Sequence, residues 1–521
     1  MPINLIGRQE DIELVSIVEA ALIRSFSVAG VQRLNYVATE QVDGCYLFVN
    51  PQDEQAGLIE QLLAKRTKII LLGSLGVALG RTLGLEVEAL EAGDFQDYLS
   101  LIETDTFDQS QLSIHYVSDS PILARLKARS RPLLRYDFTD EWNTLGFGGI
   151  QKGPSPWSIC QKVRAITASS LAQLTNQIGQ TFGLYASLTS FETSEVLWFN
   201  RQVGPVDSWE WAIVEDFYSH YRSDELPCIP HLREIPSGYQ GAVTMRLDCD
   251  QAIATSRPLF ELYRDAGLPF SLAVVTGLPP QVEDMALLRD VIAAGGSVVS
   301  HSVTHPPNWG ADHAQALQEA QDSKRWLEQH LPEVGSVRYA VSPFHQNPPY
   351  AVQALTDAGY QGFVGGIIHN DPEYLIGRAG RVPFCEPPIV SHSQQCMLHG
   401  DCYHRYGNSV DPYLESFSNH LKAGNIFGYL DHPFSATYQY GWLSETERLA
   451  AHAELIRFIQ SHEDIWFPNL VQCLDFVRKR DQVQISVEAD QLQVRCDPKG
   501  IPGDLPTISV GWRGETIDLG I

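Results

Sequence analysis

The fold of this chain is constrained most by a regular alternation of short apolar runs and longer amphipathic segments between residues 242 and 364. The apolar runs have the length of buried strands, and the segments between them have the length and periodicity of helices. Successive strand–helix units predict a parallel sheet that forms a complete or incomplete barrel, with functional side chains at the carboxyl ends of the strands. We expect strands at 242–247, 270–275, 297–300, 336–341 and 362–364, and helices at 255–267, 284–294, 311–330 and 349–358.

Two aspartates stand at the end of the first of these strands. Asp248 and Asp250 are at i and i+2, so on an extended backbone both side chains point to one face, while Cys249 points to the other. Two carboxylates this close repel each other, and a divalent cation would relieve that repulsion. One could bind the metal while the other acts as a general base. The alternative is a pair of surface aspartates in a turn.

Two histidines follow the third strand. His301 and His305 are four residues apart, so both imidazoles can reach one ion if the segment coils by a helical turn, and Pro306 ends any helix there. Such a pair, taken alone, is more often unrelated to metal binding. In the same barrel as Asp248 and Asp250, it predicts a site of two histidines and one carboxylate with open positions for water and substrate.

Residues 241–480 resemble the polysaccharide deacetylase family, the NodB-homology group of carbohydrate esterases. The run HSVTH at 301–305 matches the family motif His-Ser/Thr-x-x-His. The run RLDCD at 246–250 differs from the usual Thr-Phe-Asp-Asp and is similar to the Arg-x-Asp-x-Asp form of a branch that deformylates lipid-linked aminoarabinose. The resemblance implies a distorted (β/α) barrel and a divalent ion, zinc with cobalt or nickel as alternatives.

The resemblance also implies roles for individual residues. It makes Asp250, His301 and His305 the metal ligands and Asp248 the base, although the altered motif leaves the order of the two aspartates open. His432 follows a strand expected at 425–430 and matches the histidine that serves the family as general acid. A carboxylate beside this imidazole could keep it protonated. The alternative for His432 is a capped loop histidine.

The third motif of the family supplies an arginine that orients the base and a backbone N–H for the oxyanion. Its candidate here lies at 338–344, which makes Arg338 the orienting arginine, although arginine and proline are further apart than usual. The N–H near Phe344 would help to hold the oxyanion, and His345 would contact substrate. We identify no counterpart of the fourth motif, which contains an aspartate and a tryptophan.

A second cluster of potential ligands lies further along the chain. It comprises His392, Cys396, His399, Cys402 and His404. The ligand types suit a second, structural metal, but the spacing matches no known zinc module. The alternative is an insertion over the barrel mouth that contacts substrate. There, Tyr438, Tyr440 and Trp442 could stack on a sugar ring.

The remaining sequence predicts further parts, since 521 residues are too many for one core. Alternating strands and helices over residues 1–100 predict an open α/β domain of Rossmann or flavodoxin type. Short alternating runs predict a β-rich α+β domain over 101–237 and a small β appendage over 481–521, with the barrel between them at 238–480. A glycine-rich loop at 73–80 could cradle a phosphate, or it could serve tight turning and helix packing.

Composition narrows the partners and the compartment. A net charge of −26 argues against a nucleic-acid or anionic-membrane partner, which would need a basic face. The opening residues do not resemble a signal peptide, and the longest apolar run, 69–80, is too short to cross a bilayer. The nine cysteines show no paired framework, which fits reduced thiols. We therefore expect a cytoplasmic protein without an integral membrane segment.

The predicted function is metal-dependent removal of an N-acyl group, in the first instance acetyl, from an amino sugar or polysaccharide. A bound metal would polarise the acyl carbonyl and acidify water. One alternative is a deformylase or other amidohydrolase acting on a lipid- or nucleotide-linked sugar. Another is a non-catalytic glycan-binding protein that keeps the fold. The predicted partner is a carbohydrate, and the sequence leaves the oligomeric state open.

Overall fold

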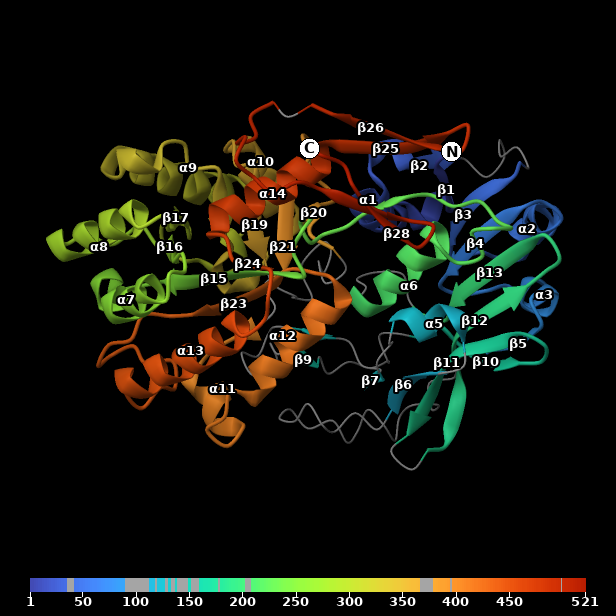
Figure 1. The fold of residues 1–521 in the computed structure, drawn as a ribbon, viewed down its shortest axis with the longest axis horizontal. Coiled ribbons are helices and arrows are strands. Elements are labelled where there is room, and N and C mark those ends of the chain that lie inside the picture. Colours follow the sequence, from blue (N-terminus) through green and yellow to red (C-terminus); the bar gives the residue numbers. More distant parts are fainter. Residues whose placement is uncertain are drawn as a thin grey trace.

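The computed structural model describes residues 1–34, 42–89, 112–117, 120–126, 130–132, 136–137, 149–150, 159–176, 179–201, 208–365, 378–393, 396–497 and 499–521. It is a mixed α/β structure in which two large sheets lie next to each other, as Figure 1 shows. One sheet belongs to the amino-terminal part of the chain, and the other begins with β15 (Gly241–Cys249). The predicted α/β class is thereby confirmed.

The amino-terminal sheet is built by β1 (Ile3–Ile6), β2 (Val31–Leu34), β3 (Gly44–Val49), β4 (Thr67–Leu72), β6 (Leu112–Tyr116), β7 (Arg131–Pro132), β11 (Ser169–Asn176), β12 (Thr181–Ser190) and β13 (Ser194–Phe199). Within the described residues, its order is β2-β1-β3-β4-β13-β12-β11-β6-β7. The strands from β2 to β13 in this order are parallel, and the others are antiparallel. The predicted domain boundary at residue 100 falls inside the stretch of chain that builds this sheet, and it stays a prediction.

Smaller elements complete this part of the chain. Two further pairs of strands join β5 (Leu85–Ala89) to β10 (Gln161–Ala165) and β8 (Tyr136–Asp137) to β9 (Gly149–Ile150). The helices are α1 (Ile12–Phe26), α2 (Ala56–Leu63), α3 (Val77–Thr82), α5 (Pro121–Leu126) and α6 (Ser208–Ser219). Among the described residues, no helix combines the length and the apolar character needed to cross a membrane.

The glycine-rich loop at 73–80 leads into α3, whose first N–H groups already have a partner. The Asp53 carboxylate accepts hydrogen bonds from the Ala78 and Leu79 N–H groups at 2.9 and 3.2 Å. A Cβ atom on Gly76 would lie 2.1 Å from the Asp53 Oδ1 atom, so glycine permits this close approach. A phosphate would have to displace this carboxylate, which favours the packing interpretation of the loop.

The second sheet contains the strands predicted between 242 and 364. Its members are β15, β16 (Ser271–Val274), β17 (Ser297–Ser300), β18 (Tyr339–Val341), β19 (Gly362–Gly365), β20 (Gly380–Arg381), β21 (Val390–Ser393), β22 (Cys396–Met397), β23 (Phe427–Asp431) and β24 (Ile465–Trp466). Among the described residues, the order is β20-β21-β19-β18-β17-β16-β15-β23-β22, with β24 also beside β15. All pairs are parallel except β20 with β21.

This sheet is strongly curled. The strands β21 and β22 lie near opposite edges of the sheet order, yet Ser393 and Cys396 are only three residues apart in the chain. Three Cα–Cα steps span at most about 11 Å, so the two edges must come close together. Among the described residues no ladder joins β21 to β22. The arrangement is compatible with the predicted distorted barrel, whose closure stays a prediction.

Helices cover the outer face of the curled sheet. They are α7 (Arg257–Asp265), α8 (Val282–Ala293), α9 (His313–His330), α10 (Pro349–Asp357), α11 (Gly400–Arg405), α12 (Asp411–Ala423) and α13 (Glu445–Gln460), while α14 (Leu470–Gln482) packs on the opposite face. Figure 1 shows α7, α8, α9 and α13 arrayed around the strands. Each helix predicted between 255 and 358 is present, with its ends moved by a few residues, as expected where terminal turns fray.

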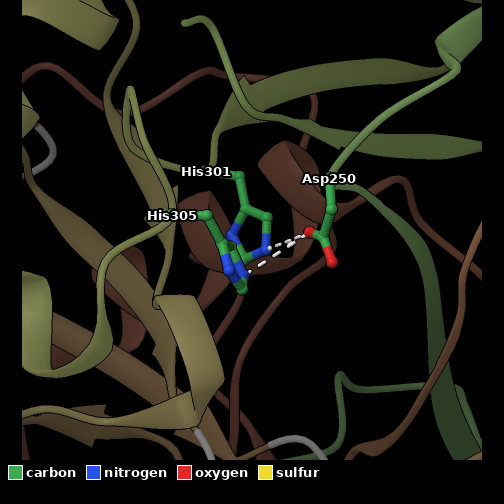
Figure 2. A group of neighbouring side chains, drawn as sticks. All are labelled: Asp250, His301 and His305. Atoms are coloured by element: carbon green, nitrogen blue, oxygen red, sulfur yellow. Dashed lines mark ion pairs between the residues drawn. The ribbon is translucent and has the colours of Figure 1, made fainter.

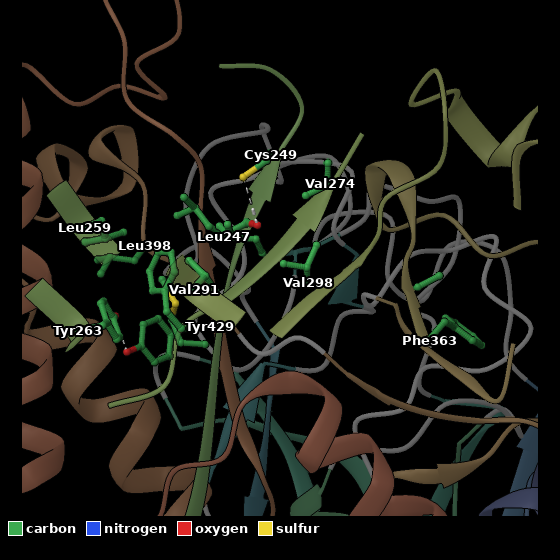
Figure 3. Packing of buried hydrophobic residues seen from close by; sticks show 14 of the residues in the cluster. Leu247, Cys249, Leu259, Tyr263, Val274, Val291, Val298, Phe363, Leu398 and Tyr429 are labelled. Atoms are coloured by element: carbon green, nitrogen blue, oxygen red, sulfur yellow. Dashed lines mark hydrogen bonds between the residues drawn. The ribbon is translucent and has the colours of Figure 1, made fainter. Parts of the chain in front are cut away.

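The two faces of β15 carry different chemistry. Met245, Leu247 and Cys249 belong to the large apolar cluster under the outer helices, and Figure 3 shows the last two packed in it. Because strand side chains alternate, Arg246 and Asp248 point to the other face, although both are buried. The alternation of side chains along β15 therefore places its apolar residues in the core and its polar residues in the candidate site.

The last forty residues form short strands, as predicted. The hairpin of β25 (Val483–Glu488) and β26 (Gln491–Cys496) contacts the amino-terminal part through Ser27, whose hydroxyl group accepts from the Ile485 N–H at 3.0 Å. A second hairpin, β27 (Ser509–Trp512) with β28 (Glu515–Asp518), pairs with β14 (His231–Leu232). These strands connect the amino-terminal part to the second half of the chain.

A buried ion pair, Glu215 with Arg378, also joins the two halves, with N···O distances of 2.8 and 3.0 Å. Burial opposes ionisation of Glu215, but Arg378 lowers its pKa to about 2. A lowered folded-state pKa stabilises the fold above the ordinary value of 4.5, and this contribution is lost as pH falls towards 2. We expect the loss to be about 3 kcal/mol.

Urea unfolding measured across this pH range tests the expectation. The Glu215→Gln variant should be less stable at neutral pH, because Arg378 then lacks its charge partner. It should also lack the corresponding part of the acid-dependent loss of stability. An unchanged slope of stability with pH in this variant would contradict the assignment.

Candidate active site

The candidate site lies at the carboxyl ends of the central strands, where the ladder brings distant segments to one level. Cys249 at the end of β15 pairs with Val274 of β16, and Val274 pairs with Ser300 at the end of β17. The next residues, Asp250 and His301, therefore leave the sheet at the same height. The strand-end rule for parallel barrels predicted this edge.

The strand on the other side of β15 contributes a third segment. Leu247 pairs with Asp431 of β23, so His432 follows directly at the level of Asp248. Residues more than 180 positions apart in the chain thus meet at one edge of the sheet. The register of the parallel strands is enough to bring these residues together, because neighbouring parallel strands end at the same edge of the sheet.

Asp250, His301 and His305 form a compact group, shown in Figure 2. The Asp250 Oδ1 atom lies 3.3 Å from His301 Nε2 and 3.5 Å from His305 Nε2. One potential ligand atom from each residue lies within 4.8 Å of those of the other two. Two imidazoles and one carboxylate are a donor set suited to Zn²⁺, Co²⁺ or Ni²⁺.

Further features of this group fit a divalent cation. Asp250 Oδ1 is buried and accepts no hydrogen bond from the described residues, an unfavourable state for a carboxylate oxygen unless a cation lies beside it. The His301 Nδ1 atom donates to the Val341 carbonyl oxygen at 3.0 Å, which turns Nε2 towards Asp250. Burial opposes protonation of this ring, but Asp248 and Asp250 raise the pKa of His301, so a cation would take the place of a proton between Nε2 and the carboxylate. Burial and His301 lower the pKa of His305 to about 4, so its imidazole is neutral, as metal binding requires.

The segment from His301 to His305 is a tight loop and not the helical turn that the spacing suggested. Ser302 and His305 have positive φ angles of 68° and 54°, and the His305 N–H donates to Ser302 Oγ at 3.0 Å. Glu319 on α9 accepts from the N–H groups of Val303 and Thr304 at 2.7 and 2.9 Å. These bonds turn the chain so that the two imidazole centroids lie 4.7 Å apart.

Asp248 lies beside the group and has a partner of its own. The Arg246 guanidinium donates to both of its oxygens, at 2.8 Å from Nε and 3.2 Å from a terminal nitrogen. Burial alone would raise the pKa of Asp248, but Arg246 and the neighbouring histidines hold it at about 2. The carboxylate is therefore ionised at neutral pH and able to accept a proton.

His432 faces Asp250 from the other side, with Nε2 3.9 Å from Asp250 Oδ2. Its ring stacks on Tyr440 at a centroid distance of 3.6 Å, and its Nδ1 atom lies 2.8 Å from His399 Nε2. Burial and His399 lower the pKa of His432 to about 4. The imidazole is therefore neutral at neutral pH, and the expectation that an adjacent carboxylate keeps it protonated is wrong.

The carboxylate of Asp431 is directed elsewhere. It accepts from Arg448 Nε at 2.7 Å, from His452 Nε2 at 3.0 Å and from Trp442 Nε1 at 3.3 Å. It also accepts from the His432 N–H at 2.7 Å, and Arg448 donates to the His432 carbonyl oxygen at the same distance. Burial opposes ionisation of Asp431, but Arg448 and His452 keep its pKa well below its usual range. This network fixes the backbone that carries His432.

Two of the residues predicted to contact substrate lie at the site, and two other predicted residues do not. The Phe344 ring is half exposed and lies 4.5 Å from the His305 ring, and His345 is buried close to Arg246 and Asp248. Arg338 is not brought to Asp248, because it precedes β18 and donates to Asp475 on α14 at 2.8 Å. Trp442 is only 1% exposed, so its ring cannot stack on a sugar.

The five residues of the predicted second cluster do not come together as one metal site. Among the described residues, the groups with suitable ligand geometry contain only one of them, His399, with Asp431 and His432. His404 Nδ1 lies 2.7 Å from Asn408 Oδ1, and Cys396 and Cys402 are buried cysteines that form no disulfide within the described residues. The carboxylate in the His399 group is already bound by Arg448 and His452, so its donor set is occupied.

Sequence reasoning missed two contributions to this site. Arg246 stands two residues before Asp248 on the same strand, so the period of two was a signal that could have identified it as the partner. Tyr438 and Tyr440 were expected to stack on sugar, but their hydroxyl groups lie 2.5 and 3.4 Å from Asp250 Oδ2. No local pattern predicts that contact, because Asp250 lies 188 residues before Tyr438.

Comparison with known proteins supports the resemblance found in the sequence. Residues 250–363 match the family model described as polysaccharide deacetylase. The matched stretch contains Asp250, His301 and His305. No curated protein sequence matches this chain.

Several solved structures are similar to this one. A polysaccharide deacetylase of Mycobacterium smegmatis, so described provisionally, has a TM-score of 0.38 and 14% identity, and the match covers 49% of this chain and 96% of that chain. The structure of Agd3, described as a novel carbohydrate deacetylase, has a TM-score of 0.39 and 10% identity, with coverage of 98% and 93%. A family 4 carbohydrate esterase from Streptomyces lividans in complex with acetate has a TM-score of 0.29 and 16% identity, with coverage of 44% and 92%. At such scores we draw no conclusion about activity from them.

Proposed function

We propose that this protein is a metal-dependent hydrolase that removes an N-acyl group, in the first instance acetyl, from an amino sugar or polysaccharide. The main support is the grouping of Asp250, His301 and His305 next to an ionised Asp248. The polysaccharide deacetylase match over residues 250–363 gives independent support. A divalent cation held by these three residues would polarise the acyl carbonyl and acidify water.

The side chains around the three candidate ligands have different roles in the proposed reaction. Asp248, ionised and held by Arg246, accepts the proton of the attacking water. His432, on the far side of Asp250, donates a proton to the leaving amine. Because its imidazole is neutral in the free protein, His432 must first receive the proton that Asp248 took from the water, which leaves Asp248 ionised again. The N–H near Phe344, in the short turn that follows β18, helps to stabilise the oxyanion.

A product screen tests the reaction directly. The purified protein is incubated with chito-oligomers, acetylated amino sugars and sugar nucleotides, and released acetate and formate are measured separately. Acetate release that a chelator abolishes and added Zn²⁺ restores is the expected result. Release of formate alone would favour the deformylase alternative. Absence of both products together with absence of bound metal would favour a glycan-binding role without catalysis.

Replacing His301 by alanine is expected to remove the metal and, with it, the activity. The imidazole supplies one of the three ligands. Because His301 is buried, no side chain from the protein surface can take its place at the metal. Metal content after dialysis, measured by plasma mass spectrometry, should fall from stoichiometric to background. The matched control is His313→Ala, because His313 is exposed and bonds Asp357 on the outer helices. Full metal content in the His301 variant would contradict the ligand assignment.

A further inference from the structure

Asp250 presents its two oxygens to different partners. Oδ1 faces the Nε2 atoms of His301 and His305. Oδ2 lies 2.5 Å from the Tyr438 hydroxyl oxygen, the distance of a short, charge-assisted hydrogen bond. The Tyr438 hydroxyl group donates this bond to the carboxylate oxygen.

The loop that carries Tyr438 is held in place by backbone contacts. Ser435 and Tyr438 exchange two hydrogen bonds, at 2.8 and 3.2 Å, which close a tight turn. The Gly400 N–H donates to the Tyr440 carbonyl oxygen at 2.9 Å. A Cβ atom on Gly400 would lie 2.1 Å from the Trp442 nitrogen, so α11 and the loop approach more closely than any other residue type allows. Tyr438 therefore loses little further conformational freedom when its hydroxyl group bonds Asp250.

We propose that Tyr438 is a positioning residue that holds Oδ2 of Asp250 away from a bound divalent cation, so that only Oδ1 serves as a ligand. This inference rests on the metal centre of the proposed function. A carboxylate that is free to rotate can bind a metal through both oxygens and occupy a position needed by water or substrate. Partners in the outer shell of a metal site fix the orientation of its ligands in this way.

The neighbouring Tyr440 offers a matched control. Its hydroxyl group lies 3.4 Å from the same Oδ2 atom, at the limit of a hydrogen bond, while its ring stacks on His432. Tyr440→Phe therefore removes a hydroxyl group that lies 3.1 Å from the Tyr438 hydroxyl oxygen, while the short bond from Tyr438 to Asp250 and the ring stacking on His432 are kept. The two variants separate the effect of the Tyr438 bond from a general disturbance of the loop.

The test measures metal binding without substrate. Zn²⁺ affinity is determined by competition with a chromophoric chelator for wild type, Tyr438→Phe and Tyr440→Phe. We expect Tyr438→Phe to weaken Zn²⁺ binding about 10–100-fold. Tyr440→Phe should change it by no more than about threefold, because a bond this long contributes little. The visible spectrum of bound Co²⁺ should weaken only in Tyr438→Phe, as a second carboxylate oxygen raises the coordination number.

The possible results of this test distinguish the positioning role of Tyr438 from the proposed hydrolase function. Equal Zn²⁺ affinity and an unchanged Co²⁺ spectrum in Tyr438→Phe would overturn the positioning role and leave the proposed hydrolase intact. Equal weakening in both variants would also overturn it, since the whole loop would then be responsible. If wild type binds no divalent metal, the proposed function itself fails. The predicted difference between the two variants supports the positioning role.

Discussion

Replacing Asp248 by asparagine is expected to lower kcat by about 10²–10⁴-fold while the metal content stays stoichiometric. Asparagine keeps the shape and one oxygen that Arg246 can bond, but it cannot accept a proton from water. Within the part of the chain that the structure describes, Arg246 donates the hydrogen bonds of the Asp248 carboxylate, and the interaction with His301 is one of charge. Asparagine should therefore leave Asp250, His301 and His305 in place. Turnover is measured by acetate release, and bound Zn²⁺ is measured on the same sample.

Asp250→Asn is the contrasting variant. It removes the negative charge of the carboxylate that faces both imidazoles, and a neutral amide is a much weaker metal ligand, so the variant should lose metal and activity together. The pair of variants therefore decides the question that the motif leaves open, namely which aspartate binds the metal. If Asp248→Asn loses the metal while Asp250→Asn retains it, the two roles are exchanged. Thermal melting of both variants checks that the fold survives.

Replacing Asp431 by alanine is expected to destabilise the protein by about 3–5 kcal/mol, the usual effect of breaking a buried ion pair by removal of one partner. Arg448 and His452 are both 0% exposed, and Asp431 is their common acceptor. Trp442 Nε1 also loses its acceptor. Because the same carboxylate fixes the backbone N–H of His432, activity should fall as well. Urea unfolding gives the free energy of unfolding.

Glu445→Gln provides the control for this experiment. Glu445 bonds the same Arg448 guanidinium at 3.0 Å, but from a partly exposed position. Solvent reaches Glu445, and glutamine keeps an oxygen that Arg448 can bond, so the variant should lose less stability than Asp431→Ala. If Asp431→Ala loses no more stability than Glu445→Gln, the buried network is not what holds the end of β23.

Features of this protein that follow from a local sequence pattern were predictable, whereas contacts between distant segments were not. The alternation of strands and helices between 242 and 364 was predictable, because buried strands and amphipathic helices have distinct periods. The placement of Asp248 and of Cys249 on opposite faces of β15 follows from the period of two within one strand. The contact between Arg246 and Asp248 obeys the same rule, although the sequence directed attention to Arg338.

Contacts between loops followed no local rule. His399 and His432 meet across 33 residues, and Tyr438 and Asp250 meet across 188 residues. The tight loop at Ser302 depends on Glu319 from α9, and Trp442 is buried in the large apolar cluster, where it donates to Asp431. Each of these depends on how separate segments pack, which a sequence pattern of short range cannot specify.

The sequence by itself determined the parallel strand–helix order, the edge of the sheet that carries the site and the residue types gathered there. It did so because side-chain period and strand direction are local properties of the backbone. Only the tertiary structure decided that Arg338 bonds Asp475 and not Asp248, that Asp431 turns away from the His432 ring, and which oxygen of Asp250 faces the histidines. Those choices depend on distances between segments, and such distances exist only after the chain has folded.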